Sequence, residues 1–195
     1  MKRVVYFLLL LVVMVGCDNN KTITYQTIDT NFTWGNVKSY GAFYDSIGIP
    51  SNVFSLDLYS TKLGFDSLGY IIGTGTNLYF SDIFLEPTCS TLAVGEYQND
   101  TTGAAYTFLP GVNYEGSFSG AYLLVVGETS YSVDLIPQGT FTLTQTEDST
   151  FISFTLVRQS TTRVYEASFR GVLPYEDMCR SEIRKSHLPN KRQID

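Results

Sequence analysis

Histidine and cysteine are scarce in this chain. Its 195 residues include one histidine, His187, and three cysteines, Cys17, Cys89 and Cys179. A Ser-His-Asp or Cys-His catalytic arrangement needs an imidazole that the fold holds in position, whereas His187 stands in a polar C-terminal stretch. A zinc site needs clustered cysteine and histidine ligands. We therefore expect neither histidine-dependent catalysis nor a metal centre.

Two glycine-containing stretches lack the residues that would give them a chemical role. Gly116-Ser117-Phe118-Ser119-Gly120 has a phenylalanine where a nucleophile elbow carries its nucleophile. Gly73-Thr74-Gly75 lacks the third glycine of a dinucleotide-binding loop, and no βαβ pattern surrounds it. We expect no cofactor and no enzyme of these classes.

Carboxylates keep one enzymatic alternative open, because a pair of them can hydrolyse glycosides without histidine. Four acidic residues fall in expected strands: Asp57, Asp82, Asp134 and Glu166. Charged residues in alternating strands usually belong to the solvent-facing set. We therefore expect a non-enzymatic protein, with a glycoside-active enzyme as an alternative.

Positive charge is in short supply. Lys and Arg number 13 against 19 Asp and Glu, which gives a net charge of −6. An acidic chain is poorly suited to nucleic acid and to flat adhesion on anionic lipid. We expect no nucleic-acid partner.

Long hydrophobic runs are absent except near the N-terminus, where Val4 to Val15 follow Lys2 and Arg3. This run is shorter than the about 20 residues that a membrane-spanning helix needs. A basic start followed by a short apolar core is typical of a secretory signal peptide. We therefore assign residues 1–16 to a signal peptide.

The residues that end this run, Met14-Val15-Gly16-Cys17, resemble a bacterial lipobox, with methionine where leucine is usual. The resemblance implies a thioether-linked diacylglycerol on Cys17 and a further acyl chain, such as palmitate, on its amino group. Two or three acyl chains anchor a protein stably where one does not. Residues 17–31 are then the lipid anchor and tether, and the membrane is the first partner.

The two remaining cysteines, Cys89 and Cys179, form an even pair in an exported chain. They form either a disulfide or two independent buried thiols. The sequence does not reveal whether their Cα atoms approach closely enough to bridge.

Apolar residues alternate with polar ones along most of the chain, as in strands with one buried face. The pattern is clear in residues 54–59, 152–157 and 165–170, and turn residues separate the segments. Many short strands with regular turns predict an all-β, antiparallel β-sandwich over residues 32–173, either jelly-roll or Ig-like.

The last segment, residues 174–195, has a different pattern. Tyr175, Met178, Cys179 and Ile183 fall at helical spacing after Pro174. We expect a short helix here, followed by a polar tail.

Aromatic residues recur just after glycines, as in Gly95-Glu96-Tyr97, Gly120-Ala121-Tyr122 and Gly139-Thr140-Phe141. With the lipobox, this rhythm resembles the β-sandwich lipoproteins common in Bacteroidetes, most of which have no assigned activity. The resemblance implies a place in the cell envelope, at the outer membrane. It leaves open whether the domain faces the periplasm or the cell surface.

Bacteria of that group O-glycosylate exported proteins where Asp precedes Ser or Thr and then a small aliphatic residue or Thr. Four positions match this pattern: Ser46, Ser67, Thr101 and Ser149. The resemblance implies glycans at these positions. The alternative is that Asp-Ser and Asp-Thr pairs are ordinary turn residues.

Trp34 is the only tryptophan, and Phe32, Tyr40, Phe43 and Tyr44 surround it in the sequence. It belongs either to the core between two sheets or to an exposed aromatic surface that binds a sugar ring or a protein. Together these features predict a membrane-anchored, non-enzymatic lipoprotein that binds a protein partner or a glycan. A structural subunit of a surface fibre, built by strand addition, is the first alternative.

Overall fold

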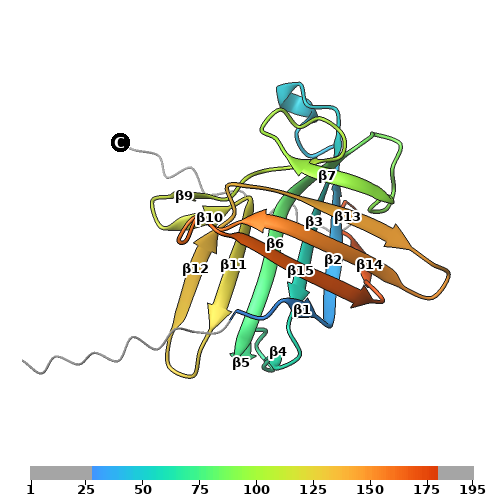
Figure 1. Ribbon diagram of the computed structural model, residues 1–195. Coiled ribbons are helices and arrows are strands. Elements are labelled where there is room, and N and C mark those ends of the chain that lie inside the picture. Colours follow the sequence, from blue (N-terminus) through green and yellow to red (C-terminus); the bar gives the residue numbers. More distant parts are fainter. Residues whose placement is uncertain (1–27, 180–195) are drawn as a thin grey trace, which may run out of the picture.

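A computed structural model describes residues 28–179, most of which lie in strands (Figure 1). The first eight strands are β1 (Asn31–Phe32), β2 (Trp34–Gly41), β3 (Asn52–Tyr59), β4 (Leu63–Phe65), β5 (Ile71–Gly73), β6 (Gly75–Leu85), β7 (Gly95–Asn99) and β8 (Thr107–Phe108). The others are β9 (Val112–Tyr114), β10 (Ser117–Ser119), β11 (Ala121–Val126), β12 (Tyr131–Leu135), β13 (Gln138–Gln145), β14 (Thr150–Val157), β15 (Val164–Gly171) and β16 (Tyr175–Asp177). One short 3-10 helix, η2 (Asp45–Ile47), precedes β3.

Strand β6 is the centre of a 12-stranded mixed sheet. One of its edges pairs with β3, which continues through β2 to β16. Its other edge is shared: β11 pairs with Gly75–Phe80, and β8 pairs with Ile83 and Phe84. The sheet therefore divides along β6. Strands β11 and β12 extend the layer of β2, β3 and β6, whereas β8 leads through β7 to β13, β14, β15 and β1.

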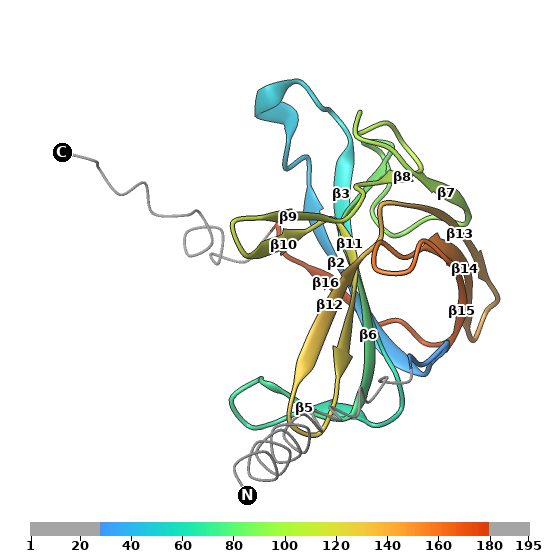
Figure 2. The same ribbon diagram turned by 60° about the vertical axis from the view of Figure 1, so that its left-hand side comes forward.

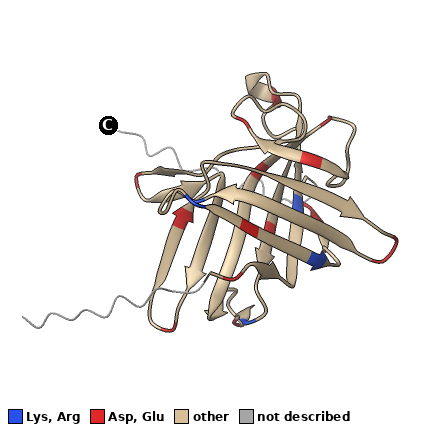
Figure 3. Ribbon diagram, viewed as in Figure 1, with Lys and Arg blue, Asp and Glu red and all other residues tan. Residues whose placement is uncertain are grey.

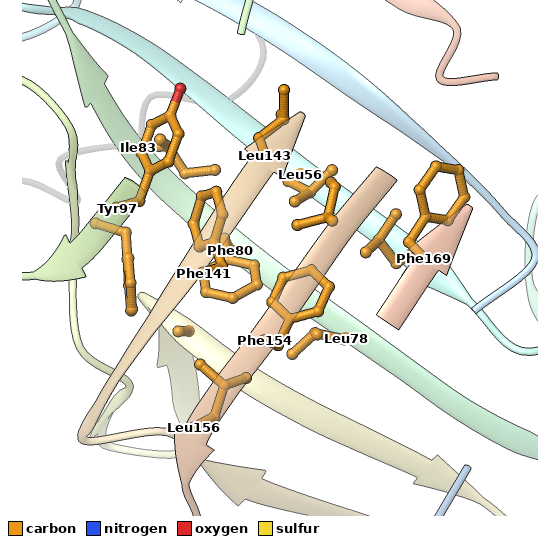
Figure 4. Close-up of a cluster of buried hydrophobic side chains, with 14 of the residues drawn as sticks. Leu56, Leu78, Phe80, Ile83, Tyr97, Phe141, Leu143, Phe154, Leu156 and Phe169 are labelled. Atoms are coloured by element: carbon orange, nitrogen blue, oxygen red, sulfur yellow. The ribbon is translucent and has the colours of Figure 1, made fainter. Parts of the chain in front are cut away.

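This second arm curls back over one face of the first layer, as Figure 2 shows for β7, β13, β14 and β15. Both arms supply side chains to a single core (Figure 4). Phe80 of β6 lies at its centre, with ring centroids 5.0 Å from Phe108, 5.3 Å from Phe141 and 5.8 Å from Phe154. Burial of these rings is the main force that holds the curled arm against the layer.

A glycine is required where β10 passes into β11. Gly120 has a φ of +74°, and a Cβ at this position would lie 2.0 Å from the carbonyl oxygen of Pro110. Its backbone N–H also donates to Ser81 Oγ at 2.8 Å. This close approach places β11 beside β6. Strand β8 pairs with the same edge of β6, nearer the end of that strand.

The prediction of an all-β fold is confirmed. The prediction of two antiparallel sheets packed as a sandwich is wrong. The sheet is mixed, because β1 with β15, β7 with β8 and β16 with β2 are parallel pairs. It is one strongly curled half-barrel sheet in place of two separate sheets. Alternation shows which side chains are buried, but it does not identify the neighbouring strand, and the bridging strand β8 has only two residues.

The helix expected after Pro174 is also wrong for the residues that the structure describes. Tyr175–Asp177 form β16, parallel to β2. The backbone N–H of Val37 donates to the carbonyl oxygen of Pro174 at 2.9 Å, and that of Met178 donates to Ser39 at 2.9 Å. This segment therefore pairs with the open edge of β2 as an additional strand. Ile183 and the remainder of the expected tail lie outside the described residues.

Candidate functional site: an aromatic face with carboxylates

The layer of β2, β3, β6 and β11 has a second face, turned away from the core. Leu56 and Leu58 of β3 are in the core, so Asp57 and Tyr59 point to the opposite side. Cross-strand pairing continues this side across the layer: Trp34 lies opposite Tyr59, Asp57 opposite Tyr79, and Tyr79 opposite Tyr122. We call Trp34, Asp57, Tyr59, Tyr79 and Tyr122 the aromatic face.

Trp34 stacks on Tyr59, with ring centroids 4.1 Å apart and planes 13° apart. Phe65 of β4 meets both rings edge-on, at 5.6 Å from Trp34 and 5.3 Å from Tyr59. Trp34 is half-buried and lies outside the core cluster of the described chain. The tryptophan thus belongs to the aromatic face and not to the core between the two arms.

Asp57 is held among these rings by two hydrogen bonds. Tyr59 donates its hydroxyl to Oδ2 at 2.5 Å, and Asn77 Nδ2 donates to Oδ1 at 2.5 Å. Burial raises the pKa of the Asp57 carboxyl above its ordinary value, and the bonds from Tyr59 and Asn77 and the charge of Lys38 offset this only partly. A carboxylate has about four acceptor positions, so Asp57 keeps capacity for further donors.

Tyr79 and Tyr122 extend the face from β6 to β11, with ring centroids 5.2 Å apart. Burial raises the pKa of both phenols, and the negative charge of Asp57 adds to the rise. Both hydroxyls therefore remain protonated at neutral pH and can donate hydrogen bonds. Phe118, on the β9–β10 hairpin, approaches Tyr122 with a centroid distance of 6.2 Å.

A second carboxylate, Asp82, follows Tyr79 along strand β6. It accepts a hydrogen bond from the Tyr44 hydroxyl at 2.7 Å, and another from the neighbouring Ser81 hydroxyl. Asp82 and Asp57 both contribute to the raised pKa of Tyr79. Tyr79 therefore lies within electrostatic reach of both carboxylates.

The other two carboxylates in expected strands have different surroundings. Asp134 is buried and forms an ion pair with Arg158 at 2.6 Å, and Ser160 donates to it from both its N–H and its hydroxyl. It lies in an open cleft of about 840 Å³ beside the β11–β12 turn, but its charge is already balanced. Glu166 on β15 is exposed.

The charge pattern of the described chain is sparse and acidic. Figure 3 shows few basic segments, and many of the acidic ones lie near turns. Lys38 of β2 is the cation whose charge lowers the pKa of Asp57. In the part of the chain that the structure describes, no three His, Cys, Asp or Glu residues form a group that could hold a metal ion.

The remaining predicted sites lie away from this face or outside the described range. Cys17 lies outside it. Cys89 follows β6 and packs against the core, whereas Cys179 follows β16, with its Sγ beside the backbone of Gly41 and 3.9 Å from the Ser39 carbonyl oxygen. Their disulfide stays a prediction.

The predicted glycosylation residues all lie in or beside turns. Ser46, Ser67 and Thr101 are exposed. Ser149 is half-buried, and its Oγ lies 3.1 Å from Thr146 Oγ1 in the β13–β14 turn. Their modification also stays a prediction.

Four residues of this site were not predicted from the sequence: Tyr59, Asn77, Tyr79 and Tyr122. The sequence did contain a signal for this site. In residues 54–59 and 78–82, the positions between the core residues carry Asp and Tyr in addition to the small polar residues that are usual on a solvent-facing side. What alternation cannot show is that β11 lies beside β6, since residues 86–120 separate them.

Between residues 28 and 179 there is no helix with the length and apolar character needed to cross a membrane. Comparison with known proteins finds no protein family that matches the sequence, no curated protein with significant similarity, and no solved structure with a significant match.

Proposed function

We propose that this chain is a membrane-anchored, non-enzymatic lipoprotein of the outer membrane whose aromatic face binds a neutral glycan. One observation carries the proposal: the rings of Trp34, Tyr79 and Tyr122 lie along a layer that also holds Asp57 and Asp82. The lipobox-like residues that end at Cys17 support the anchor.

A sugar suits this surface because it has both apolar and polar parts. The C–H face of a pyranose can stack on an aromatic ring, as other apolar groups do. Its hydroxyls need acceptors and donors at the ring edges. Asp57 retains acceptor capacity, and the protonated hydroxyls of Tyr79 and Tyr122 can donate.

The carboxylates favour a glycan over a protein partner. The centre of a protein interface is rich in aromatic residues but depleted of charged ones. Here Asp57 directly faces Tyr79 across the strands, and its desolvation is already reflected in its raised pKa. A sugar hydroxyl can satisfy such a group, whereas an apolar protein surface would bury it further.

The acidic character of the chain favours a neutral ligand. Its net charge is −6, and Asp57 and Asp82 lie in or beside the aromatic face. A sulfated, phosphorylated or uronic acid glycan would bring like charge close to these carboxylates.

The direct test is a titration of the mature chain from residue 17 onward, with Cys17→Ala so that no lipid is present. Trp34 is the only tryptophan, so its emission reports on the face when neutral and acidic oligosaccharides are added. We expect saturable changes with a neutral glycan and none with its acidic counterpart. Emission that stays constant with every glycan in the panel would contradict the proposal.

Glycoside hydrolysis is a second candidate, favoured by one specific observation. Glycosidases combine a carboxyl of raised pKa with a second carboxylate, and here the pKa of Asp57 is raised while the charges of both Asp57 and Asp82 act on Tyr79. New reducing ends in the titrated samples, abolished by both Asp57→Asn and Asp82→Asn, would establish this activity. We expect no product.

A further inference from the structure

The β4–β5 hairpin exposes apolar side chains in its turn and on β5. Leu68 is 79% exposed, Tyr70 68% and Ile72 50%. On β4, Leu63 is buried and Phe65 packs against Trp34 and Tyr59. The hairpin is thus fixed to the layer through β4, whereas Leu68 and Tyr70 of the turn and Ile72 of β5 are exposed; we call these three residues the tip.

The turn of this hairpin is defined by hydrogen bonds. Asp66 Oδ1 accepts hydrogen bonds from the backbone N–H groups of Leu68 and Tyr70, both at 2.9 Å. The Asp66 N–H donates to the Tyr70 carbonyl oxygen at 3.0 Å, and Gly69, with a φ of +84°, donates to Asp66 at 3.1 Å. Because the turn is already ordered, contact through Leu68 loses little conformational entropy.

The described chain begins beside this hairpin. Residues 28–31 and Ser60–Lys62 line one small pocket, and the Asp29 N–H donates to Thr76 Oγ1 at 2.9 Å. In both Figure 1 and Figure 2, the β4–β5 hairpin and the start of β1 lie at the same end of the molecule. Helix η2 is at the opposite end, because β3 runs from η2 to the β4–β5 hairpin.

The distance to the lipidated residue is limited. Residues 18–27 lie between Cys17 and Ile28, and ten residues span at most about 36 Å even when fully extended. A lipid on Cys17 therefore limits how far the end that carries the β4–β5 hairpin can lie from the bilayer.

The charge of the hairpin suits contact with lipid. In residues 60–73 of this acidic chain, Lys62 and Asp66 are the charged residues, so the segment is neutral overall. A tyrosine beside aliphatic side chains is typical of surfaces that sit at the headgroup level of a bilayer.

We propose that the tip formed by Leu68, Tyr70 and Ile72 docks onto the bilayer that holds the Cys17 lipid. This contact rests on the anchor in the proposed function but not on glycan binding. It is a second attachment point, which fixes the orientation of the domain. The layer then stands upright on the membrane, with η2 and the Tyr44–Asp82 end pointing away from it.

This docking has a consequence for one predicted modification. Ser67 adjoins Leu68 in the turn, so a glycan on Ser67 would separate the tip from the lipid. The anchored protein must therefore carry an unmodified Ser67. A glycan found on Ser67 by mass spectrometry of the native lipoprotein would overturn the docking.

The test uses the full lipidated protein, reconstituted in vesicles of phosphatidylethanolamine and phosphatidylglycerol with brominated phosphatidylcholine as the quencher. Leu68→Trp places a reporter at the tip. Ile47→Trp is the matched control on η2, since Ile47 is 70% exposed at the opposite end. Wild-type protein supplies the contribution of Trp34, and circular dichroism checks that both variants fold.

We expect the tryptophan at position 68 to be quenched at least threefold more strongly than that at position 47. Equal quenching in protein that floats with the vesicles would overturn the docking and leave the anchor intact. Protein that fails to float would overturn the anchor, and the docking with it.

Discussion

The two faces of the β2–β3–β6–β11 layer come from the same strands but differ in chemistry. Toward the curled arm, Leu56, Leu58 and Phe80 are fully buried among apolar neighbours. On the other side, Asp57 lies among tyrosines and is held by Tyr59 and Asn77. The first face accounts for the fold.

The second face contains a carboxylate that is desolvated by burial. A threonine or serine at position 57 would suit a solvent-facing strand position at no electrostatic cost. Carboxyl groups with pKa values shifted by burial occur preferentially at functional sites, and burial raises the pKa of Asp57. Because of this contrast, we place the proposed binding site on the aromatic face and the larger part of the folding stability on the core face.

The largest expected effect is on the core face. Phe80→Ala removes the ring at the centre of the Phe108, Phe141 and Phe154 cluster, and it should lower the free energy of unfolding by about 3–5 kcal/mol. Urea denaturation measures this, with Phe118→Ala on the exposed β9–β10 hairpin as the control. Similar losses for the two variants would show that Phe80 is not central to stability.

A smaller loss in the free energy of unfolding is expected when a hydrogen bond on the aromatic face is removed. Tyr59→Phe removes the hydroxyl that donates to Asp57, and hydrogen bonds to charged groups contribute about 1.5–3 kcal/mol. The variant should lose stability within this range in urea. Asp57→Asn combined with Tyr59→Phe should lose less than the sum of the single variants, because the two groups interact.

Stability should also depend on pH through Asp57. Its carboxyl pKa is raised in the folded state from the ordinary value of 3.8, so the folded protein holds this proton more tightly than the unfolded chain. The stabilisation is complete below that ordinary value and is lost as pH rises through the folded pKa. Wild-type protein should therefore lose stability relative to Asp57→Asn between pH 4 and 7, as measured by urea denaturation. If wild-type protein instead gains stability relative to Asp57→Asn as pH rises over this range, the pKa of Asp57 is lowered by folding and the account of this carboxyl is contradicted.

The smallest effect on stability is expected at the β4–β5 tip. Leu68 is exposed, so Leu68→Asp should change the free energy of unfolding by less than about 0.5 kcal/mol. Thermal denaturation of the mature, non-lipidated chain measures this. A larger loss would mean that Leu68 packs within the fold and does not face a membrane.

Much of the core could be predicted from the sequence, because alternation is a local property. Ile152, Phe154 and Leu156 are buried as their spacing indicates, and so are Tyr165, Ala167 and Phe169. The curled sheet could not be predicted, since it depends on the two-residue strand β8 pairing with both β6 and β7 and on three parallel pairings. The C-terminal segment formed a strand because of the open edge of β2, which its own helical spacing does not reveal.

The candidate site was only partly accessible from the sequence. Trp34 was identified as a candidate, with its placement left open between a core and an exposed surface. Tyr79 and Tyr122 become a pair only because β11 lies against β6. The polar partners of Asp57 likewise come from β3 and β6 together.

The most direct test of the account is the affinity of the mature Cys17→Ala chain for the neutral glycan identified with Trp34 emission, measured by calorimetry. The double variant Tyr79→Ala/Tyr122→Ala is compared with Tyr114→Ala/Tyr131→Ala, whose tyrosines are 74% and 73% exposed and lie outside the aromatic face. We predict at least a tenfold loss for the first pair and less than a twofold change for the second, with both variants folded. Equal affinities for wild type and the first pair would contradict binding at the aromatic face.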